Sequence, residues 1–459
     1  MSIDRWRGLR RVTMGLTTAS VVALVAANGA QAQSLLDVLV ATYDSNPTLA
    51  AQREAVRGSN EAIAQALAAY RPSVSADASI AGRWTQDQGD IDSSESINPA
   101  TIGITIEQPL YSFGREAGVN AANFSIEAAR ANYVGTEQSV LLNAVTAYVD
   151  VVQDQALLGV AINNENVLRR QLLATQDRFE VGEVTRTDVA QAQASVAGAV
   201  ALVVQNRGSL EDSRATFAQV VGFQPGDLTQ PDVPVGLPTS LEEAIILAEA
   251  RNPSVLGAEF TQQAASEQIE VEEGDLLPSF AVVGSARSTQ NPSEFLDRRD
   301  TAEIQVQMVW QLYQGGFENS QVRQQRYLAG QRNIEIDETR RSVVADTITA
   351  WENLATARAN ISSFRSQVSA NAIALEGVQQ EALVGTRTVL DVLDAEQAVL
   401  DSRSSLIQAQ RDEIVAAYSL LAQVGLMTAA DLQLPVTVYD FGPDYERTRD
   451  RWFGNSIDD

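Results

Sequence analysis

The 459-residue chain contains no histidine, no cysteine and no lysine, so its 33 basic residues are all arginines. Without His or Cys it has no zinc finger, no haem-binding His, no thiol nucleophile and no Ser-His-Asp triad. Without Lys it has no P-loop lysine and no Schiff base. We therefore expect no cofactor and no metal centre, and a metal site could only consist of carboxylates. The 59 acidic residues give a net charge of −26, which argues against nucleic acid as a partner.

The first 32 residues have the pattern of a signal peptide. Four arginines (Arg5, Arg7, Arg10 and Arg11) precede a mostly apolar stretch at 12–27, and Ala30-Gln31-Ala32 follows as a cleavage signal. The apolar stretch is shorter than the roughly 20 residues that a spanning helix needs. Removing residues 1–32 leaves 29 basic and 58 acidic groups and a net charge of −29. We expect export to the periplasm or outer membrane of a Gram-negative bacterium, without an acyl anchor on a cysteine.

The chain contains an internal repeat. Ser34-Leu35, Asn46-Pro47 and Pro72-Ser73 recur 206 positions later, and Val181-Gly182 and Asp188-Val189 recur 203 positions later. So regular an offset predicts a duplicated structural unit. We expect a first repeat at 33–222, a Pro-rich linker at 223–239, a second repeat at 240–425 and a C-terminal tail at 426–459.

Proline placement predicts long helices in both repeats. No proline occurs at 110–224 or at 293–434, and both stretches are rich in strong helix formers. We expect a helix at the start of each repeat and long helices at 114–222 and 316–425. A helix from Gly114 to Val181 would reach roughly 100 Å. The later helices keep a heptad typical of coiled helices, at Val189, Val196, Val203, Leu210 and Phe217 and at Leu393, Leu400, Ile407, Ile414 and Leu421.

Short alternating segments predict a β-hairpin before each long helical region, at about 73–108 and 279–311. We expect loops at 86–100 and 290–300. Ile104, Val282 and Val306 would lie on an apolar face, and Thr105, Val283 and Gln305 on a polar one. The apolar face could cover a soluble core, or it could face lipid in a transmembrane β-barrel. The apparent lack of a hydrophobic helix favours the barrel. Four strands cannot close a barrel, so two chains would supply eight strands, or three chains twelve.

The run Val-Gly-Thr-Arg-Thr-Val-Leu-Asp-Val-Leu-Asp-Ala at 384–395, within this duplicated helix and hairpin pattern, resembles the TolC family of outer-membrane channels. The resemblance implies a mixed fold, mostly α with a transmembrane β portion. A homotrimer would close a 12-stranded β-barrel in outer-membrane lipid, and its coiled hairpins would form an α-barrel across the periplasm. It also implies an exit duct that docks with a periplasmic adaptor and an inner-membrane transporter of ABC or RND type. The cargo, drugs or a type I secreted protein, stays open.

The two helical hairpins are expected to reverse at Gly182 and Gly385, since Gly adopts positive φ readily. A capping pattern follows each turn: Thr185 with Asp188, and Thr388 with Asp391. Capping accounts for the two aspartates at the helix starts. It does not account for Asp394, whose counterpart in the first repeat is Gln191.

By resemblance, this region is the periplasmic gate. Asp391 and Asp394 would line the constriction, and Arg387 would tie its hairpin to Thr187 or Asp188 of a neighbouring hairpin. In the family, a tyrosine pairs with the aspartate that corresponds to Asp188. Ala382 stands at that tyrosine's position in this chain, so this link between hairpins in the closed state is absent or replaced.

Two other functional classes remain for comparison. An enzyme using paired carboxylates is not expected, because the only candidates lie in the duplicated helix turns. A periplasmic coiled-coil scaffold or adaptor without its own pore is the alternative to a channel. It would account for the heptads but not for the two amphipathic hairpins.

Overall fold

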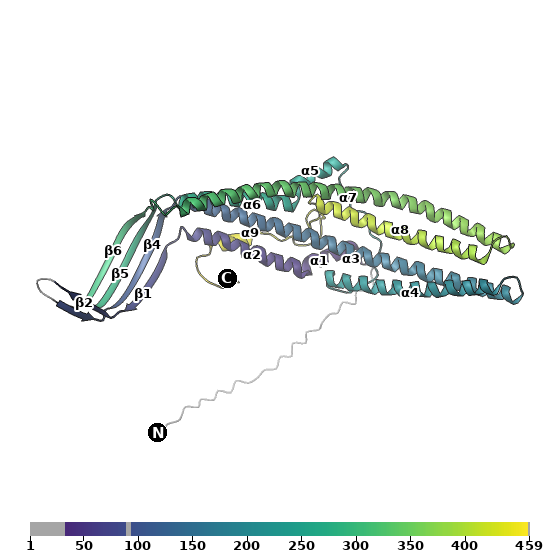
Figure 1. Cartoon of the computed structure of the whole chain (residues 1–459), viewed down its shortest axis with the longest axis horizontal. Coiled ribbons are helices and arrows are strands. Elements are labelled where there is room, and N and C mark those ends of the chain that lie inside the picture. Colours follow the sequence, from purple (N-terminus) through teal and green to yellow (C-terminus); the bar gives the residue numbers. More distant parts are fainter. Residues whose placement is uncertain (1–32, 89–92, 458–459) are drawn as a thin grey trace, which may run out of the picture.

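The computed structural model describes residues 33–88 and 93–457 of the chain. The expected signal peptide at 1–32 lies outside the described residues, as do positions 89–92 and the last two residues. The molecule is long and narrow, with a β-sheet at one end and the turns of two helical hairpins at the other (Figure 1). The long helices therefore separate the sheet from the hairpin turns.

Two pairs of shorter helices precede the strands. They are α1 (Leu35–Ser45) with α2 (Pro47–Ala68), and α5 (Leu241–Arg251) with α6 (Pro253–Gly274). Each pair breaks at an Asn-Pro dipeptide, because Pro holds the preceding residue in an extended conformation. The Asn side chain then caps the second helix: Asn46 Oδ1 accepts the N–H of Thr48, and Asn252 Oδ1 accepts that of Ser254, both at 2.9 Å.

Four long helices form the two hairpins. They are α3 (Arg115–Glu180), α4 (Arg186–Val221), α7 (Phe317–Leu383) and α8 (Val389–Gln423). α3 has 66 residues and α7 has 67, so each reaches about 100 Å. Most heptad positions are buried, namely Val196, Val203, Leu210, Phe217, Leu393, Leu400, Ile414 and Leu421. This buried stripe is where the shorter helix of each hairpin packs on neighbouring helices.

Two of these helices are more apolar than the sequence reading allowed. By length and composition alone, α3 and α4 each contain an 18-residue stretch apolar enough to cross a membrane, so the expected lack of a hydrophobic helix is wrong by this measure. Only 33% of the stretch in α3 and 22% of that in α4 is buried within the chain. Composition of this kind is weak evidence for a membrane span. The low buried share does show that the first hairpin leaves apolar surface uncovered.

The main sheet joins both halves of the chain. It is antiparallel, and its order is β1 (Ser73–Ile80), β4 (Ala100–Tyr111), β5 (Ser279–Ser293) and β6 (Leu296–Val309). Opposed residues in neighbouring strands lie on the same face. Ile104 is opposite Ala286, and Val282 is opposite Val306. This register confirms that Ile104, Val282 and Val306 share one face.

The three residues expected on the polar face, Thr105, Val283 and Gln305, do share the opposite face of the sheet. Val283 is opposite Gln305, and Thr105 is opposite Ser285, two residues along β5 from Val283. Within the described chain β1 and β6 each pair on one side only, so both edges of the four-stranded sheet are open.

Both predicted loops are shorter than expected. The segment expected as a loop at 86–100 contributes to a two-stranded ribbon, β2 (Arg83–Asp87) paired with β3 (Ser93–Ile97). The first strand ends at Ile80 instead of continuing to Trp84. At 290–300, β5 and β6 extend until only two residues separate them. The polar composition that indicated loops also suits strands with both faces in water, so composition did not distinguish the two.

The C-terminal tail packs into the middle of the molecule. Met427 and Ala429 are fully buried, and the Tyr43 hydroxyl accepts the N–H of Tyr439 at 3.0 Å. A further helix, α9 (Gly442–Asp450), lies along α2 (Figure 1). The tail therefore contributes to the hydrophobic core beside α1 and α3.

Candidate functional site

The two hairpin turns have the same backbone geometry. Gly182 has φ of 81° and Gly385 has φ of 83°, a region that disfavours residues with a Cβ atom. The N–H of Glu183 donates to the carbonyl oxygen of Arg178 at 2.9 Å, and that of Thr386 to Glu381 at 3.0 Å. These bonds satisfy carbonyl groups that the helix end would leave without a partner.

A capping box begins the helix after each turn. The hydroxyl and the backbone N–H of Thr185 both donate to Asp188 Oδ2 at 2.7 Å. Thr388 donates to Asp391 Oδ2 in the same way, with both distances 2.8 Å. The backbone N–H of Thr388, then its hydroxyl, and then the charge of Arg387 lower the pKa of Asp391. Asp391 therefore stays ionised at the helix start, where the helix dipole favours negative charge.

Arg387 pairs with a residue that the sequence reading missed. Its Nε donates to Glu381 Oε2 at 2.8 Å, and its Nη1 lies 3.9 Å from Asp391 Oδ1. The hydrogen bond with Glu381 raises the pKa of Arg387. The six-residue closure of the turn brings the two side chains together. One sequence signal could have indicated Glu381: it lies at the expected end of the helix before this turn, next to Ala382.

The structure does not bring Arg387 to Thr187 or Asp188. No hydrogen bond or ion pair joins them in the part of the chain that the structure describes. Such a bond to a neighbouring chain stays a prediction.

Asp394 has a different environment from Asp391. Its side chain is exposed one turn further along α8, and within the described residues it forms no hydrogen bond or ion pair. Folding of the turn therefore accounts for Asp391 but not for Asp394.

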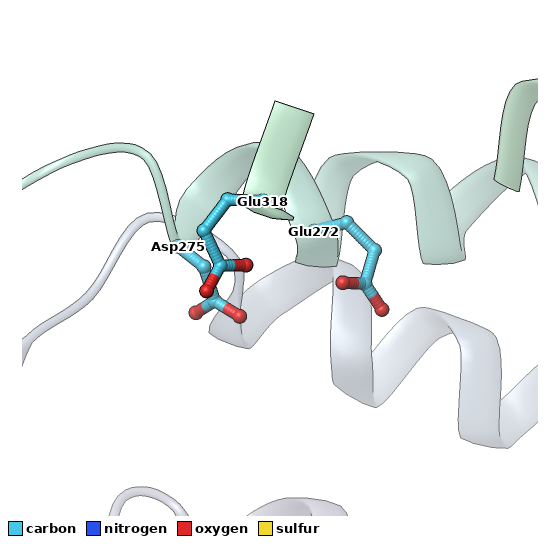
Figure 2. A group of neighbouring side chains, drawn as sticks. All are labelled: Glu272, Asp275 and Glu318. Atoms are coloured by element: carbon cyan, nitrogen blue, oxygen red, sulfur yellow. The ribbon is translucent and has the colours of Figure 1, made fainter. Parts of the chain in front are cut away.

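A second acidic group lies near the sheet. Glu272, Asp275 and Glu318 come from the end of α6 and the start of α7, and their carboxylate oxygens lie within 4.8 Å of one another (Figure 2). Burial, and then the charge of Glu272, raises the pKa of Asp275. Exposed acidic groups like this are common without an ion, so we assign it no function.

Comparison with known proteins identifies the family. The profile of the outer membrane efflux protein family matches residues 38–223 and 244–426. The chain belongs to the outer membrane efflux protein family. The outer membrane efflux protein BepC of Brucella suis biovar 1 is 35% identical over 427 residues, which cover 93% of this chain and 92% of BepC.

More distant members extend the comparison. The outer membrane protein TolC of Vibrio cholerae is 27% identical, over 87% of this chain and 92% of TolC. The alkaline protease secretion protein AprF of Pseudomonas aeruginosa is 24% identical, over 80% of this chain and 78% of AprF. The solved outer-membrane channel OprN shares the fold with a TM-score of 0.75 and 19% identity, over 85% of this chain and 89% of OprN.

Membership in the outer membrane efflux protein family answers the main question of function. The chain is an exit channel of the Gram-negative outer membrane for efflux or secretion, and the family's members are transport proteins rather than enzymes. A scaffold without a pore is therefore set aside. The fold is mostly helical with a smaller β portion, as the sequence predicts.

Proposed function

We propose that three copies of this chain close one 12-stranded β-barrel in the outer membrane and one α-barrel below it. The single observation that carries this proposal is the open sheet, in which β1 and β6 each lack a neighbour on one side within the described chain. Unpaired backbone groups are not tolerated in lipid. Pairing β1 of one copy with β6 of the next satisfies both edges.

The apolar face of the sheet is the proposed lipid-facing surface. Its side chains are largely exposed in the single chain: Ile80 by 85%, Ile304 by 84% and Val306 by 71%. A soluble sheet would cover such a face with a core. The opposite face, with Thr105 and Gln305, would line the water-filled interior.

Six hairpins, two from each copy, would form the α-barrel. The internal duplication that we propose, with repeats at 33–222 and 240–425 around the linker at 223–239, makes these hairpins equivalent. Matching bonds support it: Asn46 Nδ2 donates to Val220 O, and Asn252 Nδ2 donates to Gln423 O, both at 2.9 Å. The uncovered apolar stretches of α3 and α4 would pack on neighbouring hairpins.

The hairpin turns are the proposed periplasmic gate. In a trimer, Asp391 and Asp394 would form two rings of three carboxylates at the narrow end. Arg387 would restrain the closed state through Glu381 and through Thr187 or Asp188 of a neighbouring hairpin. The same end would dock a periplasmic adaptor and an inner-membrane transporter of ABC or RND type, since it lies farthest from the sheet (Figure 1).

Assembly is tested by the molar mass of the detergent-solubilised protein, measured by light scattering with the detergent contribution subtracted. We expect three chains per particle, because each copy leaves two open edges. A monodisperse particle of one or two chains would contradict the proposal.

The gate is tested by single-channel recording in planar bilayers. Crowded carboxylates at a narrow opening favour multivalent cations. We expect Asp391→Ala combined with Asp394→Ala to leave the trimer intact and to weaken block by a trivalent cation added from the periplasmic side.

Asp401→Ala is the matched control for this experiment, because it removes an exposed carboxylate one heptad further along α8, about 10 Å from Asp394. We expect a smaller effect from it. Unchanged block in the double variant would remove the gate from the proposal and leave the trimer standing.

A further inference from the structure

The family match ends at residue 426, and the chain continues with a tail whose last described segment is apolar and exposed. Trp452 is 57% exposed, Phe453 is 87% exposed and Ile457 is 86% exposed. Elsewhere the same tail buries its apolar residues, including Met427 and Ala429. Val438 is the other large apolar residue of the described tail that is exposed, at 45%, so the exposure is strongest at 452–457.

Arg71 fixes the position of this segment along the molecule. Its Nη1 donates to the carbonyl oxygen of Arg451 at 2.7 Å and its Nη2 to that of Arg449 at 3.1 Å. Its guanidinium lies 4.8 Å from the ring centroid of Trp452, within cation–π distance. Arg71 precedes β1 by only one residue, Pro72. The tail is therefore held where the helices meet the sheet.

The segment is a closed loop. Arg451 Nη1 donates to the carbonyl oxygen of Ser456 at 2.7 Å. Trp452 and Phe453 lie between these two residues, within the loop that the bond closes, and both side chains stay more than half exposed. A loop that orders two large apolar side chains in water gains little unless another surface covers them.

Other aromatic residues are exposed at the same end of the sheet. They lie at or next to the ends of β1, β4 and β6, and are Tyr70, Tyr111, Phe113, Trp310 and Tyr313. Aromatic residues of this kind form belts at the boundary between membrane and water, where an apolar ring and a polar group are both satisfied. The tail loop lies at the level of this belt.

We propose that the loop at 451–457 inserts Trp452 and Phe453 into the phospholipid leaflet on the periplasmic side of the outer membrane. The partner is the lipid surface itself, because the exposed apolar side chains of the loop lie at the level of the aromatic belt. The inference rests on the proposed placement of the sheet in the membrane. It does not depend on the number of chains.

The absence of cysteine makes a direct test possible, since one introduced cysteine is the only labelling site. Phe453→Cys and, separately, Ile457→Cys are labelled with an environment-sensitive fluorophore in the full chain and reconstituted into phospholipid vesicles. Separate vesicles contain phospholipids with a nitroxide quencher either just below the headgroup or near the end of the acyl chains, and iodide serves as the aqueous quencher. Ile104→Cys is the control for the membrane face, and Val235→Cys, 95% exposed in the linker, is the control for water.

We expect the shallow nitroxide to quench most of the fluorescence at Phe453→Cys and Ile457→Cys, and the deep nitroxide to quench most of it at Ile104→Cys. Iodide should quench only Val235→Cys. Iodide quenching at both tail positions would overturn the inference, because the loop would then lie in water. Protection of both positions from both quenchers would also overturn it, because protein would cover the loop. Failure of the lipid to quench Ile104→Cys would instead contradict the proposed function.

Discussion

The orientation of the sheet can be tested with one pair of neighbouring residues. Ile104 lies in β4 between Ala76 of β1 and Ala286 of β5, and its side chain is 51% exposed. Thr105 is the next residue, and its side chain lies on the opposite face, with Ser75 and Ser285 as its cross-strand partners. The two positions share the strand and its hydrogen bonds, so they differ mainly in the solvent they meet.

An arginine at each position should therefore have very different costs. In the proposed barrel, Ile104→Arg would place a guanidinium in the hydrocarbon region, which costs about 2–4 kcal/mol per chain near the middle of the bilayer. This corresponds to a factor of about 30 to about 1,000 in the folding equilibrium constant. Thr105→Arg would place the same group in the proposed water-filled interior, beside small serine side chains. Its effect should stay within about 0.5 kcal/mol, as for an ordinary surface substitution.

The measurement is the free energy of folding from urea into phospholipid vesicles, for the native protein and for both variants. We expect Ile104→Arg to fold much less favourably than the native protein and Thr105→Arg to fold nearly as well. Equal costs for the two variants would refute the assignment of faces. A larger cost for Thr105→Arg would mean that the sheet is turned the other way.

Three further predictions concern the helices. Burial raises the pKa of Glu137 above the usual 4.5. Its contribution to folding stability is therefore greatest below pH 4.5 and is lost as the pH rises through the folded-state pKa. Glu137→Gln should remove this part of the pH dependence, measured by denaturant unfolding at acidic and neutral pH. Gly425→Ala should destabilise more than Gly222→Ala in thermal unfolding. Both glycines have positive φ, which costs other residues about 1–2 kcal/mol, but only at Gly425 would a Cβ atom lie 2.5 Å from a backbone oxygen, the last one of α5. Arg387→Ser and Glu381→Gln should both raise single-channel conductance, since both break the 2.8 Å ion pair in the turn. A rise in Arg387→Ser alone would show that Arg387 acts through another partner, and no rise in Arg387→Ser would refute its role.

Features set by local sequence could be predicted well. The Asn-Pro breaks also follow from a local rule, the steric restriction that Pro places on its neighbour, although we expected one helix at the start of each repeat where the structure has two. The two faces of the sheet follow from the strict alternation of strand side chains, which is why Ile104 and Val306 could be placed on one face before any register was known. The capping boxes at Thr185 and Thr388 follow from a contact only three residues long.

Features set by distant contacts could not. The buried role of the tail depends on a core made by α1 and α3. The Glu381–Arg387 pair is a local contact of six residues, and it was missed although the expected helix end at this turn could have indicated it. The β2–β3 ribbon was missed because polar residues in water-exposed strands resemble a loop in composition. At the candidate gate, the capping pattern already separated Asp391 from Asp394 in the sequence, and the structure added the bonds that Thr388 donates to Asp391 and the pairing of Arg387 with Glu381.

The sequence by itself determined the kinds of elements, the division of faces and the absence of His, Cys and Lys chemistry, because each depends on residue type and spacing along the chain. Only the tertiary structure decided that β4 of the first half pairs with β5 of the second, and that β1 and β6 are left at the edges. Strand order is set by which surfaces meet in the folded chain, and no spacing along the chain encodes it. The same packing brings Arg71 to Trp452, about 380 positions away, and so places the tail at the end of the sheet.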